Sequence, residues 1–158
     1  FPQERYPEDV ERLTKEREVC IPAADKIPRI LRETREWLDI YFSGKRPDFT
    51  PALAPQGSDF RKVVWEELLK IPYGCTITYG QIAKQVADRK GILRMSAQAV
   101  GGAVGHNPIG IIIPCHRVVG TGGNLTGFGG GIRTKEALLK LEGMDMGRFY
   151  IPKKGTAL

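Results

Sequence analysis

Glycine is crowded into one short stretch of this chain, and that stretch limits how the chain can fold. Of the 19 glycines among 158 residues, eleven fall between Gly101 and Gly131. Glycine adopts backbone conformations that other residues avoid, and it has no side chain to hold a partner at a distance. The backbone over 101–131 must therefore turn sharply or come very close to something.

Length and composition are those of a globular protein. The chain is long enough for one domain or two very small ones, and 41% hydrophobic with 27% charged residues argues against a disordered chain. No apolar run approaches the ~18 residues of a transmembrane helix, so we expect no membrane partner. The net charge of +6 allows a polyanionic partner without requiring one.

Three cysteines and two histidines restrict the available chemistry. The odd cysteine count, without a CxxC pair, predicts neither a disulfide framework nor a zinc site, so we expect no metal. No signal peptide is visible, which favours a reducing, cytoplasmic location. Cys20 and Cys75 are expected to be inert core thiols, because free cysteine is among the most buried residue types.

A predicted linker divides the first half of the chain. Apolar residues recur every three or four positions from Pro28 as far as Gly44, which predicts a helix, and a second helix is predicted from Phe60. Segment 45–57 between them holds three prolines and a glycine and is typical of a connection between two lobes. The expected domains are an incomplete N-terminal domain over 1–50 and a C-terminal domain over 58–150.

Two short helices are predicted to follow in a helix-turn-helix arrangement. Thr78 with Gln81 three residues later forms a capping box, and Ser96 is a second N-cap after a polar connection. Helix pairs are common, so this spacing alone is weak evidence for DNA binding.

The second of these helices, AQAVGGAVG over 97–105, consists almost entirely of small residues. Small side chains let a helix backbone approach its partner closely. That partner is either another helix, packed tightly, or the minor groove of DNA, where Gln98 would be the only side chain long enough to probe the base stack.

Cys115 differs from the other two cysteines in its surroundings. The β-branched run IGIII over 109–113 predicts a buried strand, and Pro114 ends it just before Cys115, His116 and Arg117. We expect a thiol at the rim of a pocket, where a nearby positive charge would lower the cysteine pKa from ~8.5. Neighbours on an extended chain point to opposite faces, so His116 is expected to reach the sulfur only through a water or a turn.

Two other interpretations of this region are weaker. The glycine-rich segment 121–131 lacks the GK[ST] ending of a phosphate-binding loop. A cysteine protease would need a histidine far away in the sequence, and His106 is the only other one, so this remains a minor alternative. A last helix is predicted from a cap at Thr134 to a stop at Gly143.

Five segments together resemble the O6-alkylguanine-DNA alkyltransferases, also called methylated-DNA–protein-cysteine methyltransferases. TYGQIA, AQAVGGAVGHNP, PCHRVVG, GGG and KEALLKLEG occur in the order and spacing of that family and cover roughly residues 58–143. The resemblance implies an α/β (α+β) fold: a small N-terminal α/β domain, which we expect to be truncated here, and a mainly helical C-terminal domain with a helix-turn-helix and a short active-site strand.

The resemblance also implies an activity. Such a protein flips O6-alkylguanine out of double-stranded DNA through the minor groove, largely independently of sequence, and transfers the alkyl group irreversibly to its own cysteine in a single turnover. It needs no cofactor, and we expect it to act as a monomer.

The residue roles implied by the resemblance centre on Cys115 as the acceptor. His116 would be the base acting through a water, Glu142 would orient it, Asn107 would be a hinge, and Tyr79 would lie beside the flipped nucleotide. Residues implied to contact DNA or substrate are Gln98, Ala97, Ala99, Gly101, Pro114, Arg117, Val118 (through its carbonyl), Phe128, Gly129 and Gly130. Gln98 replaces the arginine finger of well-known members, and Phe128 replaces a common tyrosine.

Two functions of other classes remain as alternatives. A non-catalytic reader of alkylated DNA would share the fold, but such alkyltransferase-like proteins lack the acceptor cysteine that Cys115 supplies. A transcription factor using the helix-turn-helix would need a strong preference for one operator sequence.

Overall fold

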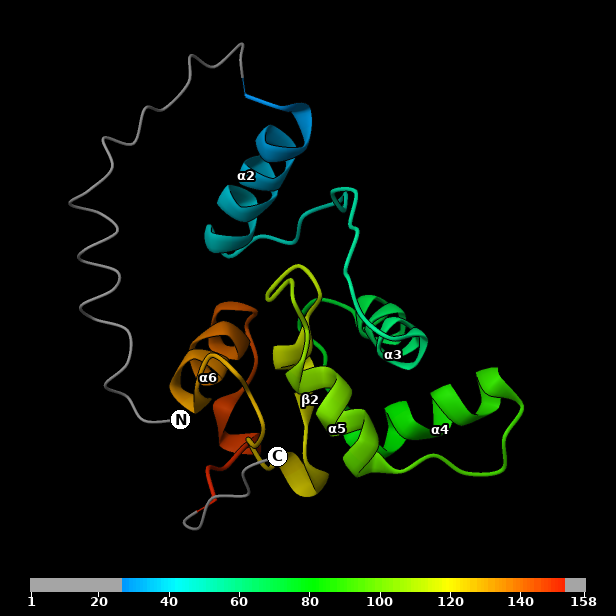
Figure 1. Cartoon of the computed structure of the whole chain (residues 1–158). Helices are drawn as coiled ribbons and strands as arrows, with labels where there is room; N and C mark the ends of the chain where they lie inside the picture. Colours follow the sequence, from blue (N-terminus) through cyan, green and yellow to red (C-terminus); the bar gives the residue numbers. More distant parts are fainter. Residues whose placement is uncertain (1–26, 153–158) are drawn as a thin grey trace, which may run out of the picture.

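The computed structural model describes residues 27–152. Five α-helices and one parallel strand pair form the described part (Figure 1), which confirms the expected mixture of helix and sheet. The helices are α2 (Arg29–Phe42), α3 (Asp59–Leu69), α4 (Tyr79–Lys90), α5 (Ala97–Gly105) and α6 (Ile132–Leu141), and the strands are β1 (Ile77–Thr78) and β2 (Val118–Val119). Three 3-10 turns, η2 (Cys115–Arg117), η3 (Thr121–Gly123) and η4 (Met146–Arg148), complete the elements.

The caps of α4 and α5 are those predicted from the sequence. The Thr78 hydroxyl accepts from the Gln81 backbone N–H, and the Gln81 side chain reaches back to the backbone N–H of Thr78. The Ser96 hydroxyl accepts from the Ala99 backbone N–H at the start of α5. Gly91 ends α4 in the left-handed conformation, at φ 63°, where a residue with a Cβ would be strained.

Helices α3, α4 and α5 pack around one apolar core. Val64 and Leu68 of α3, Ile82 and Val86 of α4 and Val100 of α5 are fully buried there. The Trp65 indole N–H donates to the Ala103 carbonyl oxygen at 2.9 Å, and this bond joins α3 to the last turn of α5. The predicted helix-turn-helix is therefore a rigid unit supported by a third helix.

The strand pair connects this unit to the cysteine. β1 lies directly before α4, and β2 lies directly after Cys115–Arg117. Ile77 pairs with Val118, and Thr78 pairs with Val119, in a parallel register. The start of the helix-turn-helix is thereby held beside the turn that carries Cys115.

The expected strand over 109–113 is not formed. The backbone there makes a tight turn, with the Ile113 N–H donating to the Ile109 carbonyl oxygen and Ile111 at φ 72°. Cys115 consequently lies in the 3-10 turn η2 rather than at the end of an active-site strand. The apolar residues are half-buried or buried as expected, but the Asn107 side chain accepts from the Ile109 N–H and bends the chain before it can extend.

Two smaller expectations also need correction. The last helix begins after Gly131 rather than at Thr134, which lies inside its first turn. Cys75 is exposed in the turn after α3 and is not a core thiol. Cys20 lies outside the described residues.

Helix α2 packs onto the C-terminal helix α6. Trp37 and Tyr41 of α2 form an apolar cluster with Ile112 and with Leu138 of α6. The division into domains over 1–50 and 58–150 stays a prediction, and α2 is the only helix of the first range in the described part of the chain.

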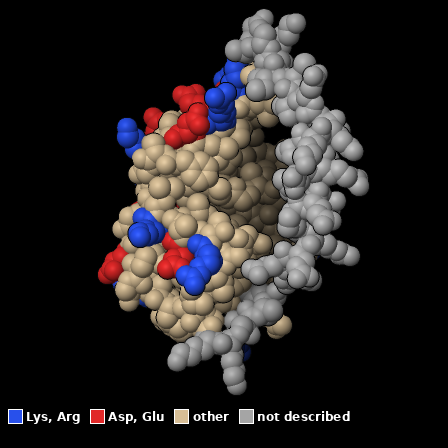
Figure 2. All heavy atoms as spheres, turned by 90° about the vertical axis from the view of Figure 1, so that its left-hand side faces the viewer, with Lys and Arg blue, Asp and Glu red and all other residues tan. Residues whose placement is uncertain are grey.

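The face drawn in Figure 2 carries lysine and arginine interspersed with aspartate and glutamate, so its charge is mixed.

Across residues 27–152, no helix is both long and apolar enough to cross a bilayer.

Candidate active site

A cavity of about 210 Å³ lies over the Cys115 side chain. Its walls come from the end of α5, the turn after it and the glycine-rich loop before α6; the lining residues are Val104, Gly105, Asn107, Gly110, Cys115, Gly127, Phe128, Gly129 and Gly130. Phe128, Gly129 and Gly130, which the resemblance implied to contact DNA or substrate, thus line the same cavity as Cys115. A Cβ on Gly130 would lie 2.7 Å from the Phe128 ring, so glycine is required for the ring to sit there.

One exposed face of α5, called its open face below, carries glycines where it meets this cavity at Gly105. Gln98, Gly102 and Gly105 follow at helical spacing, and a Cβ on either glycine would meet nothing within 4 Å. Ala97, Gln98 and Ala99 are exposed at the start of the helix. Gly101, expected on the DNA face, is buried, whereas Gly102 and Gly105 are exposed.

Asn107 ties the end of α5 to the cysteine. Its side-chain Nδ2 donates to the Ile113 carbonyl oxygen at 2.8 Å and to the Cys115 Sγ at 3.1 Å. Its Oδ1 accepts from the Ile109 N–H at 3.0 Å. A shift of the helix would therefore move the sulfur, and the placement fits the hinge expected for this residue.

The Cys115 thiol is not activated in the way that the sequence suggested. Burial raises the pKa of Cys115 above its ordinary value, although the Asn107 amide, the backbone N–H groups of Cys115 and His116 and the Lys135 charge all act to lower it. The expectation of a lowered pKa was wrong, because burial outweighs these groups and the Arg117 charge is neutralised by Glu142. A thiol with a raised pKa needs a base at the moment of reaction.

His116, the base that the resemblance implied, follows Cys115 directly in η2. Its ring is fully buried, and its Nε2 lies 2.7 Å from the Glu142 Oε1. Nδ1 makes no hydrogen bond to any residue in 27–152. Burial lowers the pKa of His116, against the opposing effect of Glu142, so the ring is neutral near pH 7. With the ring proton on Nε2, facing the carboxylate, Nδ1 carries a lone pair that can accept a second proton.

Glu142 is the most heavily hydrogen-bonded side chain of the site. Besides His116 it accepts from the Arg117 guanidinium, from the Gly74 backbone N–H at 3.0 Å and from the Tyr41 hydroxyl at 2.8 Å. Burial acts to raise the pKa of Glu142, but the hydrogen bonds from His116, Arg117 and Gly74 outweigh it and hold the pKa at about 2. The group is a carboxylate at any working pH.

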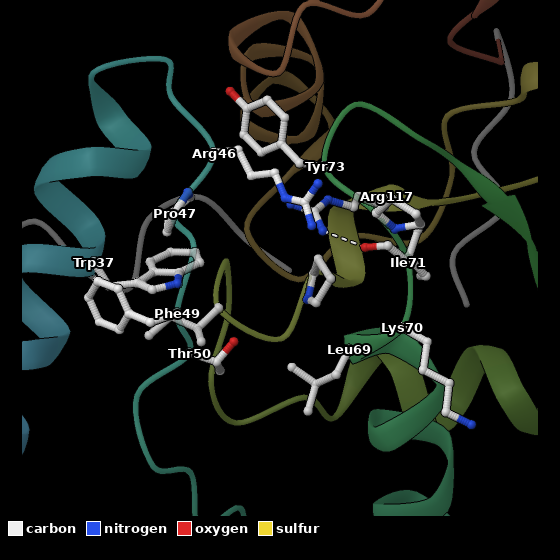
Figure 3. A pocket seen from close by; sticks show the side chains of 13 residues that line it. Trp37, Arg46, Pro47, Phe49, Thr50, Leu69, Lys70, Ile71, Tyr73 and Arg117 are labelled. Atoms are coloured by element: carbon white, nitrogen blue, oxygen red, sulfur yellow. Dashed lines mark hydrogen bonds between the residues drawn. The ribbon is translucent and has the colours of Figure 1, made fainter.

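The structure does not bring Arg117 to the cavity over Cys115. Its guanidinium is bound to Glu142 and donates to the Ile71 carbonyl oxygen at 2.7 Å. Figure 3 shows this bond at a different cavity, which Trp37, Tyr73 and Arg117 help to line. The Arg117 charge therefore holds the Glu142 carboxylate and does not face the cavity over the thiol.

Three further residues that the resemblance implied have other neighbours in this structure. The Tyr79 hydroxyl donates to the carbonyl oxygens of Thr126 and Gly127 at 3.2 and 3.1 Å, and burial raises its pKa to about 12. The Val118 carbonyl accepts from the Lys135 ammonium. Pro114 lines the cavity beside Arg117 rather than the one over the thiol.

Sequence reasoning missed two residues of the site. Lys135 is fully buried, donates to the carbonyl oxygens of Val118 and Thr126, and has its pKa lowered by burial to about 8. Its helical spacing to Leu138 and Leu139 on the apolar face of α6 was the available signal. Tyr41 gave no comparable signal, because its polar partner Glu142 lies 101 residues away in sequence.

The structure combines a helix-turn-helix, a cavity over the Cys115 thiol, and a neutral histidine, next to that cysteine in sequence, that is hydrogen-bonded to an ionised glutamate. This combination is typical of a class of protein that binds DNA and offers a cysteine nucleophile. Comparison with known proteins gives the family. The model of the 6-O-methylguanine DNA methyltransferase DNA-binding domain matches residues 59–144, and this chain belongs to that family.

Individual relatives agree with this assignment. The methylated-DNA–protein-cysteine methyltransferase of Methanosarcina acetivorans is 50% identical over 112 residues, 71% of this chain and 69% of that protein. Its counterpart in Mycobacterium tuberculosis is 52% identical over 105 residues, 66% of this chain and 61% of that protein. The chain thus spans roughly two thirds of the length of these relatives.

Solved structures are similar over the same region. The crystal structure of the M. tuberculosis O6-methylguanine methyltransferase aligns with a TM-score of 0.61 at 51% identity, covering 69% of this chain and 63% of that one. A crystal structure of the M. tuberculosis protein in complex with DNA aligns with a TM-score of 0.64 at 47% identity, covering 75% and 68%.

Proposed function

We propose that this chain repairs DNA by transferring the alkyl group of O6-alkylguanine irreversibly to the Cys115 sulfur, once per molecule. One observation carries the proposal: the open face of α5 and the cavity over Cys115 share Gly105 as a common wall. A base inside a duplex cannot reach a buried sulfur, so the nucleotide must be flipped out, at a cost of a few kcal/mol. The cavity is where the extruded base would lie.

The reaction follows from the resting protonation states. The Cys115 thiol gives its proton to the His116 Nδ1 through one water, and Glu142 stabilises the imidazolium while remaining ionised. The thiolate attacks the alkyl carbon; the S–C bond forms as the C–O6 bond breaks, and the electron pair passes to the guanine ring. Guanine leaves as the protonated, neutral base, so the thiol proton is consumed overall. The thioether product has no proton to lose and no good leaving group.

The DNA contact is proposed to rest on shape and phosphates. The glycines of α5 let its backbone approach the minor groove, and few long side chains are available there for reading base edges. Such binding would be largely independent of sequence and suits a monomer. Chromosomal DNA as substrate and a thiol that must stay reduced both fit a cytoplasmic location.

The stoichiometry of repair tests this function. Duplex DNA with a single O6-methylguanine is mixed with increasing amounts of protein, and the remaining lesion is quantified. Repair should stop at one lesion per protein molecule, however long the reaction runs. Continued turnover, or lesion binding without repair, would contradict the proposal.

Gln98 is proposed to fill the space that the flipped base leaves. Gln98→Ala should slow reaction with lesion duplex about tenfold, and should leave the reaction with free O6-benzylguanine near the wild-type rate, because only the duplex requires flipping. Rates with both substrates measure this. Gln85→Ala, an exposed glutamine of α4, is the matched control and should change neither rate. Equal slowing on both substrates would remove Gln98 from this role.

Lys135 is proposed to favour the Cys115 thiolate. Lys135→Met should raise the pKa of the Cys115 thiol by about one unit, because the variant lacks a nearby positive charge. The pH dependence of iodoacetamide labelling, followed by peptide mapping so that each cysteine is read separately, measures this shift. Exposed Cys75 is the internal reference, and Lys140→Met, on the exposed side of α6, is the matched variant. Identical Cys115 profiles in all proteins would contradict the proposed role.

A further inference from the structure

Tyr41 reaches the centre of the site from a helix that precedes the linker. It lies on α2 with a fully buried side chain, and its hydroxyl donates to the Glu142 Oε1 at 2.8 Å. The same hydroxyl oxygen lies 3.2 Å from the His116 Nε2. One hydroxyl therefore touches both members of the His116–Glu142 pair.

The ring that carries this hydroxyl is fixed in place. It stacks on Trp37 with ring centroids 5.2 Å apart and planes at 8°, and it meets the edge of Tyr73 at 6.0 Å. Offset stacking and edge contacts of this kind restrict the orientation of an aromatic ring. The hydroxyl is thus held at Glu142 by packing that does not depend on the carboxylate itself.

The donors around Glu142 have different tasks. Arg117 donates to both carboxylate oxygens and supplies the opposite charge, and the Gly74 N–H holds Oε2. Tyr41 and His116 both bind Oε1. Removing the tyrosine hydroxyl would leave Oε1 with more of its negative charge directed at the His116 ring and with freedom to move.

We propose that Tyr41 is a positioning residue for alkyl transfer: its hydrogen bond fixes the Glu142 Oε1 opposite the His116 Nε2, which keeps the imidazole proton on Nε2 and leaves Nδ1 free to take the thiol proton. The inference rests on the proposed function for its catalytic meaning, but the tautomer that it specifies is a property of the resting protein. It also makes α2 part of the site.

The charges around His116 determine the direction of the expected change. Glu142 and Tyr41 face its Nε2, and Arg117, Lys135 and the Cys115 thiol are the other titratable groups around the ring. Burial lowers the pKa of His116, and Glu142 raises it. Loss of the tyrosine hydroxyl strengthens the pull of Glu142, so the pKa of His116 should rise by about half a unit to one unit.

Nuclear magnetic resonance of the ring nitrogens tests this directly. The chain has only two histidines, and exposed His106 serves as an internal reference. We expect the wild-type His116 to carry its proton on Nε2. In Tyr41→Phe the His116 pKa should rise, so the low-pH limb of the rate profile should move to higher pH. Transfer from O6-benzylguanine should slow about three- to tenfold.

Tyr73→Phe is the matched control. Tyr73 lies beside the same ring cluster, but its hydroxyl donates to the Leu141 carbonyl and not to Glu142. It should leave the His116 titration and the transfer rate unchanged. If Tyr41→Phe does not fold, 3-fluorotyrosine at position 41 replaces it: the more acidic hydroxyl should shift the His116 pKa downward.

Three results would overturn the proposal. These are a wild-type His116 protonated on Nδ1, a Tyr41→Phe protein with unchanged His116 titration and transfer rate, and equal shifts in the Tyr41 and Tyr73 variants. Failure of the proposed function would look different, because wild-type protein would then not transfer from O6-benzylguanine while the tautomer measurement still gave its answer.

Discussion

Cys115→Ser is expected to abolish alkyl transfer and to leave binding to lesion-bearing duplex DNA at the wild-type affinity. A serine hydroxyl fits the same space and can accept the Asn107 hydrogen bond that the sulfur now accepts at 3.1 Å. It is a far weaker nucleophile than a thiol at neutral pH, because almost none of it ionises. The open face of α5, which meets the cavity at Gly105, should be unchanged by the substitution.

Two assays measure this, methyl transfer from a lesion duplex and equilibrium binding to the same duplex. Cys75→Ser is the matched control, because Cys75 is exposed in the turn after α3. It should still accept one methyl group per molecule. Transfer by Cys115→Ser at a rate near that of wild type would place the acceptor elsewhere and end the assignment.

Glu142→Gln is expected to give the largest loss of stability among single substitutions in the site. Glu142 and Arg117 form a buried ion pair with 3.0 Å between Oε2 and Nε. Removing one partner of such a pair leaves a buried charge uncompensated and costs about 3 to 5 kcal/mol of unfolding free energy. Transfer should also slow at least tenfold, because His116 loses the anion that stabilises its protonated form.

The pH dependence of stability carries the same information. The pKa of Glu142 is about 2 in the folded protein, below its ordinary value of 4.5. Its contribution to stability is therefore complete above pH 4.5 and is lost as the pH falls toward 2. Denaturant unfolding between pH 7 and pH 3 should show this loss in wild type and a smaller one in Glu142→Gln.

Glu136→Gln is the control for this measurement. Glu136 is on the same helix and faces Arg133 at 3.8 Å in an exposed pair, which contributes little to stability. Its replacement should change the unfolding free energy by no more than about 0.5 kcal/mol. Equal stability and equal acid sensitivity of wild type and Glu142→Gln would contradict the description of the site.

Features of the fold that depend on neighbouring residues could be predicted from the sequence. The capping box of Thr78 and the N-cap Ser96 were placed correctly, because a cap is settled within four residues of chain. The prediction of a strand over 109–113 was wrong for a related reason. Its β-branched composition favours extension, but the Asn107 side chain bonds to the Ile109 N–H and turns the chain.

Features of the site that depend on distant residues could not be predicted in the same way. The resemblance named Cys115, His116 and Glu142, and the structure brings the latter two into contact. The pKa of the Cys115 thiol is raised, whereas the sequence predicted that it is lowered. The degree of burial that raises it is set by segments far apart in the chain. Tyr41 was seen as an apolar helix position, since nothing local reveals where its hydroxyl points.

A non-catalytic reader of alkylated DNA is the main rival to the proposed function. It would use the same open face of α5 and the same cavity. The two functions differ at the sulfur: a reader leaves the Cys115 thiol unchanged in the complex, whereas the transferase converts it to a thioether.

Intact-mass measurement tests the central claim most directly. The protein is incubated with duplex DNA bearing one O6-methylguanine, its mass is measured, and the modified peptide is then mapped. We predict the gain of a single methyl group, on the peptide that contains Cys115, at one equivalent and no more. An unchanged mass with intact lesion binding, or a methyl group on Cys20 or Cys75, would contradict the account.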